Sequence, residues 1–119
     1  MTLEELQALT DEQLIEKVAT KVMGWMSFET YTGKRQCWAK PNTDATVFKD
    51  EWNPLADWNH TMEVVMHLHE STAFHLFSFK RSWWQAQFGD DHDGDAPVYI
   101  LDQNPQRAIC LAALLANAQ

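Results

Sequence analysis

Basic residues are scarce in this chain. Nine Lys and Arg stand against seventeen Asp and Glu among 119 residues, which gives a formal net charge of -8. That sign disfavours binding to a phosphate backbone, because such binding depends on many Lys and Arg contacts. We therefore expect no direct binding to nucleic acid.

Long apolar runs are also absent, and no basic stretch with an apolar core follows the N-terminus. We therefore expect neither a membrane-spanning helix nor a secretory signal, and we expect no membrane partner. The two cysteines, Cys37 and Cys110, form neither a metal-type pair nor a disulfide framework. We expect them to be buried thiols in a cytoplasmic protein.

Glycine is limited to four positions, so the chain has no Gly-rich loop that could hold a phosphate group. None of the serines lies in a turn flanked by glycines, as the nucleophile of many hydrolases does. The sequence therefore predicts no catalytic residue and no cofactor, although it does not exclude an enzyme.

Helical patterns begin near the N-terminus. Thr10 and Gln13 form a capping box ahead of apolar residues at helical spacing, which predicts a helix near 11–23. Thr2 and Glu5 have the same spacing upstream. The first nine residues are therefore either a separate turn of helix or a frayed extension of the first one.

Two further helices are predicted. Asp57 is placed to cap a helix near 58–70, and Asn104, followed by a proline, begins one near 105–117. The last helix has almost no polar face. It should be buried against a sheet or against a second copy of the protein.

Strand patterns occupy the rest of the chain. Alternating polarity predicts a hairpin from 25–31 and 35–39, and three aromatic or apolar runs at 74–79, 83–88 and 97–101 predict an antiparallel meander. We therefore expect residues 1–119 to form one α+β domain, an α/β/α sandwich with a mainly antiparallel sheet and about three helices.

Four ordered segments carry a family resemblance: 16–25, 58–65, 84–88 and 105–114. The packing pattern of these four segments resembles that of the phage ABA sandwich domain proteins, which are short proteins of phages and prophages. The resemblance implies an α/β/α sandwich and a phage or prophage gene. Together with the missing signal and membrane segments, this leads us to expect the protein in the host bacterial cytoplasm. It implies no activity, because the family has no established catalytic residues to carry over.

The segment 40–57 has no sustained period and is interpreted as a long connecting loop, which makes it a candidate site. Six tryptophans are more than so small a core requires. Either all of them are buried between the sheet and two helical layers, or some of them form an exposed binding surface. The residues expected to bind a ligand or partner are Trp38, Trp52, Trp58, His60 and Trp83.

Metal binding is not expected. His67 and His69 point about 160° apart on an ideal helix, and His75 lies on a predicted strand. The Asp-rich segment 90–95 lacks the ligand spacing of an EF-hand. We interpret the histidines as surface groups and the Asp-rich segment as a polar hairpin connection.

These observations favour a small acidic phage accessory protein that acts by binding, with a host protein as the possible partner. The alternative is a nucleotide or small-ligand binding protein, with a pocket built from 40–57 and the nearby Trp and His residues. Because the helix near 105–117 is apolar around most of its circumference, we also expect a homodimer.

Overall fold

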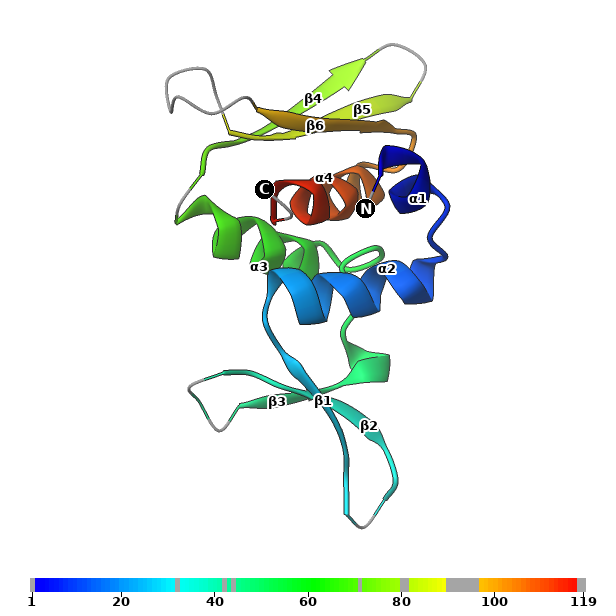
Figure 1. Cartoon of the computed structure of the whole chain (residues 1–119), viewed down its shortest axis with the longest axis vertical. Coiled ribbons are helices and arrows are strands. Elements are labelled where there is room, and N and C mark those ends of the chain that lie inside the picture. Colours follow the sequence, from blue (N-terminus) through cyan, green and yellow to red (C-terminus); the bar gives the residue numbers. More distant parts are fainter. Residues whose placement is uncertain are drawn as a thin grey trace.

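The computed structural model describes residues 2–31, 33–41, 43, 45–70, 72–79, 82–89 and 97–117. Within these residues the chain forms helices and two antiparallel sheets (Figure 1). The predicted α+β fold with mainly antiparallel strands is confirmed.

The described helices begin at the predicted caps and are α1 (Leu3–Gln7), α2 (Asp11–Lys17), α3 (Trp58–His69) and α4 (Pro105–Asn117). The capping box of Thr10 and Gln13 is present, and α2 continues as a π-helical segment, Val18–Val22. The Thr2 side chain accepts a hydrogen bond from the Glu5 amide. The first nine residues therefore contain a separate short helix.

The strands divide into two sheets in the described part of the chain. Sheet A has the order β1 (Met26–Glu29), β2 (Gln36–Ala39), β3 (Thr46–Phe48), and sheet B has the order β4 (Phe74–Phe79), β5 (Trp83–Phe88), β6 (Val98–Asp102). Figure 1 shows sheet B over α4, with α2 and α3 on the other side of α4 and sheet A beyond them. The predicted hairpin and meander are both confirmed.

Helix α4 is the centre of the molecule. Its residues from Ala108 to Leu114 are all buried. Strands β5 and β6 contact it on one side, and α2, α3 and the π-helical segment contact it elsewhere. The expected burial against a sheet is confirmed. The residues from Ala108 to Leu114 are therefore covered within one chain, without a second copy of the protein.

The interpretation of 40–57 as a loop throughout is wrong. Residues Thr46–Phe48 form β3, which pairs with β2, and Lys49–Glu51 form a 3-10 turn. A strand of three residues is too short to produce a recognisable alternation. Trp52, buried in the core, follows this turn and holds the chain against the helices.

Candidate functional site

The five residues expected at a binding site lie in separate parts of the molecule. Trp38 and Trp52 are each 2% exposed, His60 is half-buried, and Trp58 and Trp83 are exposed. Trp83 belongs to β5 in sheet B, far from sheet A and the start of α3, where the other four lie (Figure 1). These residues therefore do not line one common pocket.

Trp52 and His60 are brought together, with ring centroids 6.1 Å apart. Trp52 also packs edge-on against Trp25 at 4.7 Å. The Nδ1 atom of His60 accepts a hydrogen bond from the backbone N–H of Asn53 at 3.0 Å. This group holds the chain between sheet A and α3 in place.

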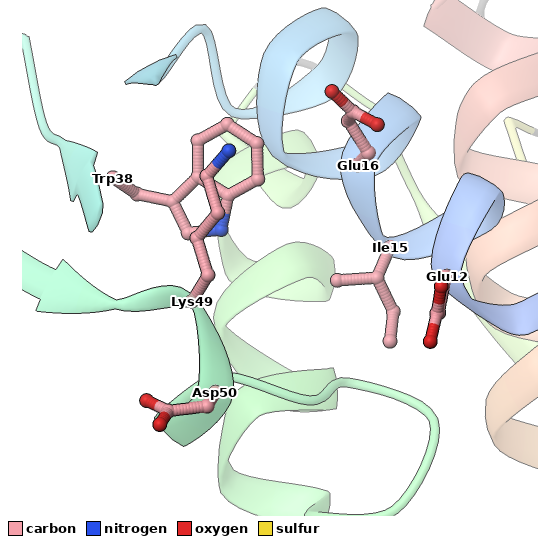
Figure 2. A pocket seen from close by; sticks show the side chains of 6 residues that line it. All are labelled: Glu12, Ile15, Glu16, Trp38, Lys49 and Asp50. Carbon is pink, nitrogen blue, oxygen red and sulfur yellow. The ribbon is translucent and has the colours of Figure 1, made fainter. Parts of the chain in front are cut away.

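A pocket of about 320 Å³ lies between α2 and sheet A (Figure 2). Its lining comes from three segments of the chain: Glu12, Ile15, Glu16, Trp38, Lys49 and Asp50. Ile15 and Glu16 lie on the same side of α2 as Glu12 because they follow it by three and four residues. Lys49 begins the turn after β3, two residues after Val47, the partner of Trp38, and its side chain reaches the Trp38 ring.

A cation already lies on the aromatic wall of this pocket. The Lys49 ammonium is 4.1 Å from the centroid of the Trp38 ring and donates a hydrogen bond to the Ser27 hydroxyl at 2.6 Å. The indole Nε1 of Trp38 is buried without an acceptor. Figure 2 shows this nitrogen on the edge of the ring that is turned toward Ile15.

Carboxylates occur on both sides of the pocket. Asp50 is neutralised by Arg35, whose guanidinium contacts its two oxygens at 2.9 and 3.2 Å. Glu12 and Glu16 have no ion-pair partner among the described residues and lie at i and i+4 on α2. The pocket therefore combines an apolar wall with an excess of negative charge.

A second surface lies on the outer face of sheet B. The register places His75, Gln87 and Tyr99 in one row across the sheet, and Phe77, Gln85 and Leu101 in the next. Trp83 occupies the same face two residues before Gln85. We call this surface the outer sheet face, and its described members are His75, Phe77, Trp83, Gln85, Gln87, Tyr99 and Leu101.

The outer sheet face carries four large apolar or aromatic side chains around Gln85 and Gln87 of the middle strand, and no formal charge over its described residues. Phe77, Trp83, Tyr99 and Leu101 are all exposed, between 42% and 56%. The rings of His75 and Phe77 stack at 5.9 Å. Figure 1 shows α4 on the opposite face of sheet B. A group of large exposed apolar side chains on one face marks an interaction site more often than single ones scattered over a surface do.

A comparison with family models identifies the family. The model described as the phage ABA sandwich domain matches residues 16–114, which are 99 of the 119 residues. The chain belongs to the phage ABA sandwich domain family. The resemblance seen in the sequence is thus confirmed. No curated protein matches the chain.

The matched part of this phage ABA sandwich domain includes the outer sheet face and four of the six pocket residues, while Glu12 and Ile15 lie before it. Sequence reasoning selected Trp38 and Trp83 but missed most other members of both surfaces. The like-charged pair on α2 was one signal available in the sequence. In β4, by contrast, apolar residues occupy both faces, so no alternation distinguishes Phe77 as exposed.

Other candidate groups in this phage ABA sandwich domain do not converge. Among the described residues, no three His, Cys, Asp or Glu side chains are placed to hold one metal ion. His67 and His69 are exposed near the end of α3, and His75 lies on sheet B. The Asp-rich segment falls at 90–95, outside the described residues.

Both cysteines of this phage ABA sandwich domain are free and buried. Burial raises the pKa of the Cys110 thiol to about 12, against a smaller opposite effect of Arg107. Its thiolate is therefore negligible at neutral pH, which makes it a poor nucleophile. Over the described residues, no helix has both the length and the apolar character needed to cross a bilayer.

Proposed function

We propose that this phage-associated domain acts by binding a host protein through its outer sheet face. The observation that carries the proposal is the group of four exposed large side chains, Phe77, Trp83, Tyr99 and Leu101, on one side of sheet B. Each lies on a paired strand, so the backbone holds them in fixed positions before a partner arrives. That preorganisation lowers the entropy cost of association.

The composition of the face favours a protein as the partner. The cores of protein interfaces are enriched in Tyr, Trp and Phe and depleted of charged residues, as this face is. Stacking of nucleic-acid bases on Phe77 or Trp83 is disfavoured, because the described face carries no Lys or Arg and the chain has a net charge of -8.

We place this activity in the host bacterial cytoplasm. Cys37 and Cys110 are both reduced and buried, in positions that form no disulfide. Free thiols of this kind are typical of proteins in a reducing compartment.

Affinity purification from host lysate tests the proposal with three forms of the tagged protein. The surface variant carries Phe77→Ser and Tyr99→Ser, and the control carries Tyr31→Ser, which removes an exposed aromatic ring outside sheet B. We expect the native chain and the control to retain the same host protein and the surface variant to lose it. Equal retention by all three, with unchanged circular dichroism, contradicts the proposal.

A homodimer remains a second prediction, although the stretch of α4 from Ala108 to Leu114 is already buried within one chain. Light scattering separates the two kinds of partner, because a monomer has a mass of 13.8 kDa. A doubled mass that Phe77→Ser with Tyr99→Ser abolishes would assign the outer sheet face to a second copy in place of a host protein.

The second candidate function is binding of a nucleotide or small ligand. The pocket between α2 and sheet A supports it, because Trp38, Lys49 and Asp50 come from or next to the segment where such a pocket was expected. Glu12 and Glu16 disfavour a nucleotide, since they repel phosphate groups. A thermal-shift screen with ATP, GTP and arginine amide tests this candidate, and a nucleotide-specific rise in Tm would favour it.

A further inference from the structure

We propose that the pocket between α2 and sheet A binds an organic cation that also has a hydrogen-bond acceptor, such as a carbonyl oxygen, in the same molecule. The guanidinium or ammonium group of an arginine or lysine residue in a peptide has this chemistry. Figure 1 shows α2 and sheet A, whose residues line the pocket, on the other side of α4 from sheet B, so this proposal does not depend on the one above.

The aromatic wall is the first element of the site. The Trp38 ring attracts cations through its negative face, where the Lys49 ammonium now lies 4.1 Å from the ring centroid, so a ligand cation would bind this face by displacing the Lys49 side chain. Ile15 and the stem of Lys49 make the remaining lining largely apolar. Such walls suit a cation that is weakly hydrated, which describes a guanidinium better than a metal ion.

The carboxylates are the second element. Glu12 and Glu16 repel each other at i and i+4, and neither has an ion-pair partner among the described residues. Figure 2 shows their carboxylates directed apart along the rim of the pocket. Because they do not converge, they fit a cation whose charge is spread over several N–H groups.

The indole N–H of Trp38 is the third element and is independent of charge. Trp38 is 2% exposed and its Nε1 has no acceptor in the described structure. A buried donor without an acceptor carries a free-energy cost, which a carbonyl oxygen of the ligand would relieve. A simple polyamine offers no such oxygen, whereas an arginine or lysine residue does.

The size of the pocket limits the ligand. Its volume of about 320 Å³ is near the lower end of the range for small-molecule sites, roughly 300 to 1,000 Å³. One long basic side chain with its own backbone carbonyl is therefore a suitable occupant.

Titration followed by NMR of the indole N–H signals tests the proposal. The probe is N-acetyl-arginine amide, with spermidine as a cation that has no acceptor and N-acetyl-alanine amide as an acceptor that has no cation. We expect the arginine compound to move the Trp38 Nε1–H signal in a saturable way. We expect spermidine to bind less tightly and the alanine compound to leave the signal unchanged.

Two double variants establish the role of the carboxylates. Glu12→Gln with Glu16→Gln should weaken binding of the arginine compound about tenfold, because charge-assisted hydrogen bonds become neutral ones. Glu4→Gln with Glu5→Gln makes the same change of net charge on α1, outside the pocket, and should alter binding less than twofold. No shift with the arginine compound, equal binding of spermidine, or equal weakening by both pairs would overturn the proposal.

Discussion

Sheet B and sheet A differ in how they are attached to the helices between them. Strands β4 and β5 have six residues each, and sheet B packs on α4 through buried side chains such as Ala86, Phe88 and Ile100. The strands of sheet A have three or four residues, and every residue of β1 is exposed. Long strands with a continuous apolar face give sheet B a large buried area against α4.

Sheet A is held by a few individual contacts. Trp38 is buried in the core, and the Lys40 ammonium, just after β2, lies 4.0 Å from the Glu63 carboxylate of α3. The ion pair of Arg35 with Asp50 and the contact of its guanidinium with the Phe48 ring at 3.5 Å join parts of sheet A and the turn after it. Charged and polar contacts of this type contribute less to the free energy of unfolding than apolar burial does. Sheet B therefore rests on a continuous apolar layer, whereas sheet A is joined to the helices by a small number of side chains.

The largest expected loss of stability comes from the layer under sheet B. Leu111→Ala removes a side chain that is fully buried in α4 and should cost about 2 to 5 kcal/mol of unfolding free energy. Val47→Ala in β3, at a half-buried position, should cost about 1 kcal/mol. Urea unfolding of both variants measures the difference, and equal losses would remove the contrast between the two sheets.

A smaller loss is expected where α3 meets α4. The buried Thr61 hydroxyl donates to the Pro54 carbonyl at 2.6 Å and accepts from Gln106 Nε2 at 3.2 Å. Thr61→Val leaves the Pro54 carbonyl and the Gln106 amide without this partner and should lower the free energy of unfolding by about 1 to 3 kcal/mol. Thr61→Ser keeps the hydroxyl and should cost less in the same urea experiment, and the reverse order would refute this role of the hydrogen bonds.

The third effect depends on pH and on Cys110. The folded pKa of about 12 lies above the ordinary value of 9.0. The resulting stabilisation is complete below pH 9 and is lost as the pH rises toward 12, because only the unfolded chain then ionises this thiol readily. Raising the pH from 8 to 10 should therefore lower the free energy of unfolding by about 1 kcal/mol through this thiol. Urea unfolding at both pH values should show a smaller decrease for Cys110→Ala, and identical decreases would contradict the assignment.

The smallest effect is expected in sheet A. Arg35→Met removes the ion pair with Asp50 but keeps an apolar stem over Phe48, and should cost about 0.2 to 1 kcal/mol because the pair is exposed. The difference from the native chain should shrink in about 0.5 M NaCl, where exposed charges are screened. A difference that is unaffected by salt would show that packing, and not charge, holds Arg35.

Local sequence signals predicted most of the fold. The capping residues Thr10, Asp57 and Asn104 begin helices at the expected positions, because side-chain caps act within a few residues of the chain. Strand β3 was missed because its three residues are ordered by pairing with β2, which is a long-range contact. The pocket was missed for the same reason, since Glu12, Trp38 and Lys49 meet only after the chain has folded.

Photo-cross-linking in host cells tests the central claim most directly. A photoreactive phenylalanine analogue is placed at Phe77, at Tyr99 or, as the control, at Tyr31. The account predicts that one host protein is captured from Phe77 and Tyr99, both on the outer sheet face, and is not captured from Tyr31. Capture of the protein's own chain, equal capture from Tyr31, or no capture at any position would contradict it.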